Sequence, residues 1–288
     1  MIVDTHVHIW EISDKYPVGP TSPTWSSYPD EPGTSEQLVE DMDAEGVDRT
    51  VIVQTSWSTW DNGYMADSVL RFPDRFIGHG LIDPQDPKNV DKARYWVKER
   101  GLAGFRLHPM YYPEEKILLN KQNEPLWEEI AELGAVVQFH LRPSDADQVS
   151  AIAGRCPDTP LILDHMGYPN LEEPLSSYDT ITDLAEFDNI FFKLSDVAGR
   201  SSQDFPYTDV HPFIRHALRK FGADRIIWGT GYPGHHRVKS NWPTLAQELR
   251  LVREGLPFLS SGEIDRILGG TAAEIWNLSK KRRNNAVT

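Results

Sequence analysis

The sequence has one cysteine, Cys156, among its 288 residues. A single thiol cannot form an intramolecular disulfide, and alone it cannot build a zinc knuckle or an iron–sulfur site. No apolar run approaches the roughly 18 residues of a membrane span, and the chain does not open on a basic stretch followed by an apolar one. These absences predict a cytoplasmic protein without a membrane partner.

Basic residues are also fewer than acidic ones. The chain has 29 Lys and Arg and 43 Asp and Glu, which give a net charge of −14. A surface of that charge repels phosphate backbones, so we expect no nucleic-acid partner. The one basic run, 280–283, lies in a segment, 279–288, that we assign to a solvated C-terminal tail. Hydrophobic residues make up 39% of the chain, which is enough for a globular core.

Short apolar, β-branched runs recur along the chain, and they predict eight strands. Several are apolar almost throughout, which is typical of parallel strands covered on both faces. The runs are Ile2–His8, Arg49–Gln54, Phe76–Asp83, Ala103–His108, Ala135–Leu141, Leu161–His165, Ile190–Ser195 and Arg225–Thr230.

Segments with helical composition or spacing lie between these runs and after the last one. They are Ser35–Glu45, Gly63–Phe72, Asn89–Glu99, Glu124–Leu133, Asp145–Ala153, Ile181–Phe187, Val210–Phe221, Leu245–Glu254 and Gly262–Trp276. This alternation predicts an α/β fold, a single-domain (β/α)₈ TIM barrel over residues 1–278. An open doubly wound sheet is the alternative, but no G-x-G-x-x-G follows the first strand.

Five of the ten histidines fall at or near the carboxyl ends of predicted strands: His6, His8, His108, His140 and His165. In a barrel these ends converge on one mouth, so the five side chains would line a single pocket. Imidazole is a common zinc ligand and a general base near neutral pH. The clustering therefore predicts a metal site, acid–base catalysis, or both.

His6 and His8 give the strongest signal, because residues two apart on a strand point to the same face and can reach one ion. The alternative is that the pair fills polar positions near the barrel axis. The other histidines at strand ends favour metal binding or catalysis.

Arg106 and His108 alternate in the same way on the fourth predicted strand, so both can face the pocket and contact a substrate. A guanidinium offers two parallel N–H groups to a carboxylate, which indicates an anionic substrate. The structural alternative for Arg106 is an ion pair with Asp83 or Asp164.

Two loops add candidate substrate contacts. Tyr111 and Tyr112 follow the fourth strand and could close over a ring, and we place Tyr112 among the substrate-binding residues. His235 and His236 follow the eighth strand, and we assign His236 to substrate binding, with a polar loop on the barrel rim as the alternative.

Four sequence blocks resemble the amidohydrolase superfamily: DTHVHIW at 4–10, FRLHP at 105–109, LDHMG at 163–167 and IWGTGYP at 227–233. The closest match is the branch of sugar-lactone and 2-pyrone-4,6-dicarboxylate lactonases, which is related to the 2-amino-3-carboxymuconate-6-semialdehyde decarboxylases. The resemblance spans residues 2 to about 278. It implies a small-molecule substrate and, at the level of the family, a homodimer.

The resemblance assigns roles to individual residues. His6 and His8 match the metal-binding pair of the first strand, and His140 matches the third histidine ligand of metal-dependent members. His165 matches the sixth-strand histidine of acid–base catalysis. The implied cofactor is one divalent ion, zinc ahead of manganese, with a metal-free reaction as the alternative.

The eighth strand departs from the family pattern, because Gly231 stands where the family carries an aspartate that binds metal or activates water. Three accounts remain open. His235 or His236 substitutes for the carboxylate; or three histidines suffice and His165 transfers the proton; or the chain belongs to an inactive or chemically different subgroup.

Binuclear members of the superfamily carry a carboxylated lysine on the fourth strand, and the fourth strand here has no lysine. Lys193, on the seventh strand, is instead assigned an electrostatic or structural role.

These residues together predict a metal-dependent hydrolase of a small lactone, cyclic ester or related carbonyl compound that bears a carboxylate. One alternative is a non-oxidative decarboxylase of the same superfamily. The other is a non-catalytic barrel that binds a small molecule, since the usual eighth-strand aspartate is absent.

Overall fold

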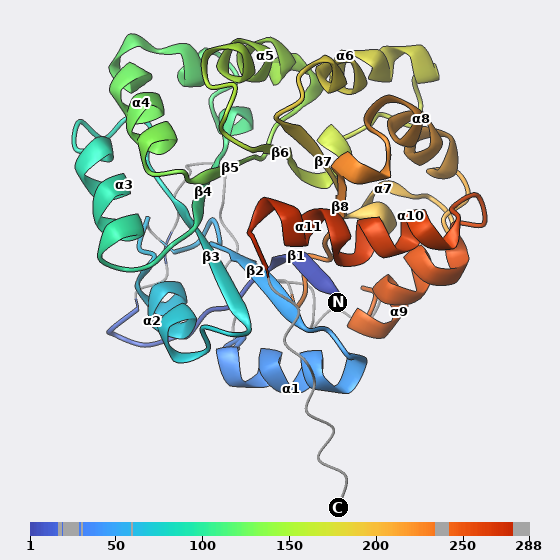
Figure 1. The fold of residues 1–288 in the computed structure, drawn as a ribbon, viewed down its shortest axis with the longest axis horizontal. Helices are drawn as coiled ribbons and strands as arrows, with labels where there is room; N and C mark the ends of the chain where they lie inside the picture. Colours follow the sequence, from blue (N-terminus) through green and yellow to red (C-terminus); the bar gives the residue numbers. More distant parts are fainter. Residues whose placement is uncertain (17–18, 20–28, 30, 59, 234–241, 279–288) are drawn as a thin grey trace, which may run out of the picture.

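The computed structural model describes residues 1–16, 19, 29, 31–58, 60–233 and 242–278 (Figure 1). Eight parallel strands form one sheet in the order of the sequence. They are β1 (Val3–Val7), β2 (Arg49–Val53), β3 (Phe76–Leu81), β4 (Gly104–Leu107), β5 (Val136–Phe139), β6 (Leu161–Leu163), β7 (Ile190–Leu194) and β8 (Ile226–Trp228). All eight predicted strands are confirmed.

Each observed strand ends one to two residues before its predicted end. The regular ladder ends there, although single backbone bonds continue past it, as from the N–H of Gln54 to the carbonyl of His79 (2.9 Å) and from the N–H of His140 to the carbonyl of Leu107 (2.9 Å). His8, His108, His140 and His165 therefore lie just past strand ends, in the loops where barrel enzymes place their sites.

The α-helices are α1 (Ser35–Glu45), α2 (Gly63–Arg71), α3 (Asn89–Lys98), α4 (Glu124–Glu132), α5 (Ala146–Arg155), α6 (Asp179–Thr182), α7 (Val197–Arg200), α8 (His211–Phe221), α9 (Leu245–Arg250), α10 (Ser261–Asp265) and α11 (Thr271–Ile275). Local chemistry sets their ends. At α1, the Thr34 side chain accepts from the backbone N–H of Gln37, and Gly46 adopts φ +72° at the other end.

Four features of the helical layer differ from the prediction. The segment expected as one helix at 181–187 is the end of α6 followed by a 3-10 turn, Asp183–Glu186. The short helix α7 is absent from the prediction. The segment expected as one helix at 245–254 passes from α9 into a π-helical turn, Leu251–Gly255, and the one expected at 262–276 is interrupted by a second, Arg266–Gly270. In the last two segments composition predicts helix but does not register a one-residue widening of the helical turn.

The sheet closes on itself where β1 meets the segment after β8. The backbone N–H of Gly231 donates to the carbonyl of His6 (2.6 Å), and Val7 bridges to Tyr232. Thr5 Oγ1 also donates to the carbonyl of Trp228 (2.7 Å). The fold is thus a (β/α)₈ TIM barrel, and the open-sheet alternative is wrong.

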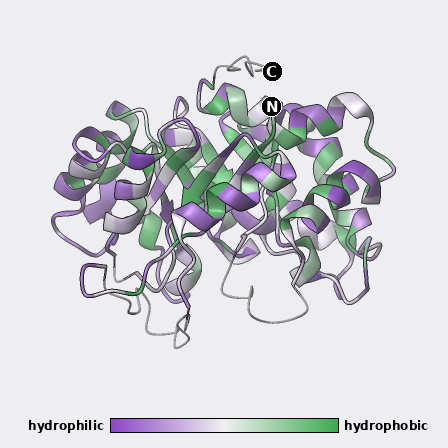
Figure 2. Cartoon of the chain, turned by 90° about the horizontal axis from the view of Figure 1, so that it is seen from below, coloured by the Kyte–Doolittle hydropathy of each residue, from purple (hydrophilic) through white to green (hydrophobic). Residues whose placement is uncertain are grey.

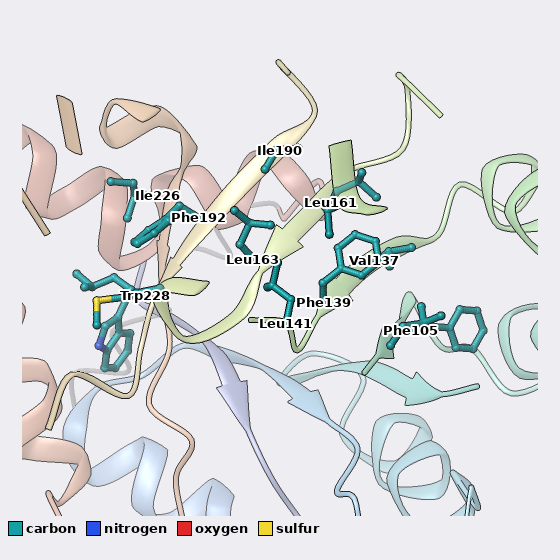
Figure 3. Close-up of a cluster of buried hydrophobic side chains, with 14 of the residues drawn as sticks. Phe105, Val137, Phe139, Leu141, Leu161, Leu163, Ile190, Phe192, Ile226 and Trp228 are labelled. Carbon is teal, nitrogen blue, oxygen red and sulfur yellow. The ribbon is translucent and has the colours of Figure 1, made fainter. Parts of the chain in front are cut away.

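Alternate residues on the strands face two separate layers. The outward side chains of β4 to β8 pack against the helices in the main hydrophobic core, including the residues labelled in Figure 3. Figure 2 accordingly shows hydrophobic strands at the centre and partly hydrophilic helices around them. The inward set begins with Val136, Ile162 and Ile227 at the amino-terminal end of the barrel.

Period-2 alternation then fixes the polar interior. On β5, Val136 points inward, so Gln138 and His140 follow on the same face. On β7, Lys193 and Ser195 point inward for the same reason. Charged and polar groups therefore collect at the carboxyl end of the barrel axis, above an apolar floor.

The C-terminal helix α11 covers the opposite end of the barrel, where Ile275 and Trp276 pack against the inner apolar cluster. Among the described residues no helix has both the length and the apolar character needed to cross a membrane. The predicted basic tail, 279–288, lies outside the described residues.

Candidate active site

A pocket of about 270 Å³ opens at the carboxyl ends of the strands, a size that suits a small molecule of one ring. It collects residues from loops that follow most of the eight strands. They are His8, Thr55, Ser56, Trp57, Arg106, Tyr111, His140, His165, Tyr168, Asp196, Arg200, Thr230, Gly231 and Trp242.

Asp164 lies beneath this pocket, fully buried, and holds its charged neighbours together. Its Oδ2 accepts from Nε of Arg106 (2.7 Å), and its Oδ1 accepts from Nζ of Lys193 (2.8 Å). Burial alone would raise the pKa of Asp164, but the charges of Lys193 and Arg106 outweigh it and hold the pKa well below the usual range. The carboxylate is therefore ionised at neutral pH.

Arg106 forms the predicted ion pair with Asp164 and not with Asp83. It also borders the pocket, and its Nη1 makes no hydrogen bond with a described residue. One edge of the guanidinium is thus used by the protein while another remains available to a ligand, so the two interpretations of Arg106 are compatible.

His165 sits between Arg106 and Ser195. Nη2 of Arg106 lies 3.0 Å from its Nε2, and Oγ of Ser195 lies 3.0 Å from its Nδ1. A guanidinium only donates, so Nε2 accepts and the ring proton is on Nδ1, from which it is donated to Ser195. Burial lowers the pKa of His165 well below its usual value, and the ring is neutral.

A left-handed turn after β6 brings both Asp164 and His165 into the interior although they are adjacent in sequence. His165 and Met166 have φ of +52° and +57°. In a regular strand the two side chains would point to opposite faces. The strand pattern alone therefore could not place them together.

The histidine pair of β1 splits between two depths. His6 is fully buried, and His8 borders the pocket; their ring centroids are 4.9 Å apart. Nδ1 of His8 lies 2.7 Å from the carbonyl of Val53, to which it donates, so its Nε2 carries the lone pair. Burial and then the charge of Arg106 lower the pKa of His8 to about 4.

His140 is engaged on both ring nitrogens. Its Nδ1 lies 3.0 Å from Nδ1 of His108, and its Nε2 lies 2.5 Å from the Tyr168 hydroxyl. It borders the pocket, whereas His108 is buried behind it and does not. His108 therefore supports His140 and the stacked ring of Tyr111 (4.6 Å between centroids) from a position outside the lining.

Tyr112 does not line the pocket, contrary to the prediction. It is half-buried against the hydrophobic core, where burial raises its pKa to about 12. Tyr111 takes the wall position instead, and its hydroxyl is 3.0 Å from Oγ of Ser56. The loop after β4 forms a short 3-10 turn, Pro109–Tyr111, which leaves Tyr111 and not Tyr112 in the pocket lining.

Gly231 borders the pocket with φ +78°, and a Cβ built there would meet no atom within 4 Å. A carboxylate from a different strand, Asp196, does line the pocket. It follows β7 and pairs with Arg200 (3.1 Å). Arg200 in turn lies over the ring of Tyr168 at 4.7 Å. Their place just after a strand is the same sequence signal that the histidines carry, but carboxylates and arginines are common on protein surfaces and stand out less in the pattern.

The candidate residues His235 and His236 lie outside the described residues. Whether either one compensates for Gly231 therefore stays a prediction.

One group of ligand atoms within the described residues could hold a metal ion: those of His6, Asp164 and His165 lie within 4.8 Å of one another. It shares His6 with the predicted set of His6, His8 and His140. Nε2 of His6 is buried and has no hydrogen-bond partner among the described residues. The donor chemistry and this unpaired atom fit a divalent ion at the His6 end of the cluster.

The chain matches the family model described as Amidohydrolase over residues 3–278. It is 28% identical to 4-sulfomuconolactone hydrolase of Rhizobium radiobacter over 233 residues, which cover 80% of this chain and 75% of that protein. It is 22% identical to L-fucono-1,5-lactonase of Burkholderia ambifaria over 289 residues, which cover 96% of each.

Solved structures share the fold. A probable 2-pyrone-4,6-dicarboxylic acid hydrolase from Acinetobacter baumannii with citric acid bound gives a TM-score of 0.81 at 18% identity, covering 96% of this chain and 99% of that one. An amidohydrolase from Burkholderia multivorans with bound zinc gives 0.76 at 20%, covering 97% and 100%. The 5-carboxyvanillate decarboxylase of Sphingomonas paucimobilis gives 0.68 at 18%, covering 96% and 99%.

Proposed function

The chain belongs to the amidohydrolase family and is an enzyme, and from this premise we propose that it hydrolyses a small lactone that carries an acidic group. Both relatives found by sequence, named above, are lactone hydrolases, and one of them acts on a sulfonated lactone by name. The pocket has the volume for one ring.

The contact between Arg106 and His165 is the observation that supports this proposal most directly. An anion anchor and a neutral general base are 3.0 Å apart at the pocket floor. While the pocket is without substrate, the guanidinium of Arg106 occupies the lone pair that His165 needs as a base. An acidic group that binds Nη1 and Nη2 together, as a bidentate anion does, competes with His165 for Nη2 and releases that lone pair. Base activation is thus coupled to the arrival of an acidic substrate.

Hydrolysis then follows with the protons balanced. His165 Nε2 takes a proton from water, whose oxygen adds to the lactone carbonyl carbon. The tetrahedral intermediate collapses, the ring C–O bond breaks with its electron pair on the leaving oxygen, and His165 returns the proton to that oxygen. The Nδ1 proton stays on the hydrogen bond to Ser195 and keeps the ring oriented.

Arg200 provides a second positive group among the residues that line the pocket with Arg106. Its Nε pairs with Asp196, and its guanidinium carbon stands over Tyr168. The acidic lactone is therefore placed with its anionic group on Arg106 and its ring against Tyr111 and Tyr168, with Arg200 available to a second polar substituent.

A divalent metal ion, zinc ahead of manganese, is part of the proposal. His6 would hold it together with Asp164 or with His8, and His140 would join only after giving up a present hydrogen bond; His165 lies in the same group but keeps its one lone pair for the base. Such an ion would act as a Lewis acid toward a carbonyl oxygen. The steps above depend on the residues alone.

A decarboxylase is the second candidate, because the fold is shared with decarboxylases. That reaction needs an acid that protonates a carbanion. His165 presents an unprotonated Nε2 and is neutral, with its pKa held well below 6.5 by burial. It is therefore suited to take a proton first, which favours hydrolysis.

A pH-stat assay on matched lactones tests the proposal. Ring opening releases one proton at neutral pH, so base uptake reports turnover of lactones with and without a carboxylate or sulfonate. We expect turnover of the acidic lactones and loss of it in His165→Gln. Binding without turnover across the panel, or release of CO₂ from an aromatic acid instead, would contradict the proposal.

A further inference from the structure

Lys193 is fully buried at the centre of the barrel and makes three contacts there. Its Nζ contacts Oε1 of Gln138, lies 2.8 Å from Oδ1 of Asp164, and lies 3.3 Å from Nδ1 of His6. Neither the family resemblance nor the proposed mechanism assigns a catalytic or binding role to Lys193.

An ammonium has three N–H donors and no acceptor, and the three neighbours supply three acceptor positions. Oxygen atoms take two of the donors, so the third falls to His6. Nδ1 of His6 lies 3.3 Å from an ammonium that can only donate, so this nitrogen accepts and carries no proton. If Nδ1 of a neutral imidazole accepts, the ring proton must be on Nε2.

The same assignment holds for either orientation of the Gln138 amide. The Trp276 indole N–H donates to Nε2 of His79 (3.1 Å), which would place the His79 proton on Nδ1, facing Gln138. In that second orientation the side-chain oxygen of Gln138 would accept from His79, and its NH2 group would donate to a neutral Lys193 amine. Such an amine still has two N–H groups, which point to the carboxylate and to His6.

We propose that Lys193 is a positioning residue that fixes His6 in the Nε2–H tautomer and thereby controls whether His6 can bind a metal ion. With the proton on Nε2, the unpaired buried atom of His6 is a hydrogen-bond donor and has no lone pair for a cation. Ion binding requires the other tautomer, in which Nδ1–H donates to a carboxylate.

The carboxylate for that second state is already beside the ring. Oδ1 of Asp164 lies 3.6 Å from Nδ1 of His6, just beyond the 3.3 Å contact with Lys193. A histidine that donates Nδ1–H to a carboxylate while Nε2 binds metal is the usual outer-sphere arrangement of zinc sites. Lys193 and a metal ion therefore compete for the same ring and the same carboxylate.

This inference rests on the proposed position of the ion at His6 but not on lactone turnover. The wild-type chain tests it first, by nitrogen-15 NMR of histidine-labelled protein in chelator-treated buffer at pH 7.5. The His6 signals are identified by their loss in His6→Gln. We expect the two-bond correlation pattern of an Nε2–H ring in the wild type. An Nδ1–H pattern would overturn the proposal without any variant at Lys193.

Lys193→Met then removes the donor and the charge at similar size, and Lys220→Met, an exposed lysine, serves as the matched control. We expect His6 to change to the Nδ1–H pattern in Lys193→Met and zinc to bind on the order of tenfold tighter by calorimetry. The control and Lys193→Arg should resemble the wild type in both readouts. Should Lys193→Met fail to fold, the wild-type tautomer and Lys193→Arg still decide. An unchanged tautomer and zinc affinity in a folded Lys193→Met would refute the role.

Discussion

Replacing Arg106 by lysine separates the two tasks that the structure gives this side chain. Nε of Arg106 donates to Asp164 (2.7 Å) and Nη2 donates to His165 (3.0 Å). The rest of the guanidinium faces the pocket. A lysine keeps one positive charge beside the buried carboxylate but has no planar fork with which to hold a substrate anion at the same time. We therefore expect the fold to survive and substrate recognition to suffer.

The size of the effect follows from one charged hydrogen bond. Such a bond contributes about 1.5–3 kcal/mol, so kcat/KM for an acidic lactone should fall by about 10- to 150-fold, mostly through KM. For a neutral lactone of the same ring, kcat/KM should stay within about threefold, because this substrate never used the fork and His165 loses a competitor for its lone pair. Initial rates on the two lactones give the ratio directly.

Arg94→Lys is the matched control, since Arg94 pairs with Glu129 on the outer surface of the barrel. It should leave both rates unchanged. An equal loss for the acidic and the neutral lactone in Arg106→Lys would refute the anchoring role and leave only the ion pair with Asp164.

Three further perturbations address the base, the missing aspartate and the buried acid of α9. In His165→Gln, kcat should fall by about 10²-fold or more while KM changes little, because the contact with Arg106 can persist without a base; steady-state rates check this. Gly231→Asp should lower the free energy of unfolding by about 1 kcal/mol, since φ is +78°, and should raise KM for an acidic lactone by repulsion; an unchanged KM would contradict its place in the pocket. Burial raises the pKa of Glu248 from 4.5 to about 8. Between these two pH values the folded chain keeps a proton that the unfolded chain releases. The free energy of unfolding therefore falls as pH rises through that window, by up to about 5 kcal/mol. Glu248→Gln should flatten that fall in urea unfolding measured from about pH 5 to 8, and an unchanged pH dependence would exclude Glu248 as its source.

The barrel could be predicted from sequence because its signals are local. Each apolar run marks a strand, and the helices between them carry their own caps, as Thr34 and Gly46 do at α1. The interruptions of α9 and α10–α11 and the short helix α7 were missed, since each depends on backbone hydrogen bonding that composition does not encode.

The site could be predicted only in part. Strand-end histidines lie together at the barrel mouth, as period-2 alternation requires, and Arg106 points inward beside His165. The left-handed turn after β6 and the 3-10 turn after β4 could not be seen in the pattern, and they decide the place of Asp164 and the exchange of Tyr112 for Tyr111.

Lys193 shows a different limit of sequence reasoning. Its strand position indicated an inward side chain, but its importance depends on contacts with residues 187 and 29 positions away, His6 and Asp164. Which nitrogen of a buried histidine carries the proton depends on all the donors and acceptors around it. These partners can be identified only from coordinates.

The central claim is that this pocket opens an acidic lactone with water. Incubation with a carboxylated lactone in oxygen-18 water, followed by mass spectrometry, tests it most directly. We predict a product heavier than the substrate by one labelled water, with the label in the newly formed carboxylate. Recovery of intact, unlabelled lactone after binding, or a product that has lost CO₂, would contradict the claim.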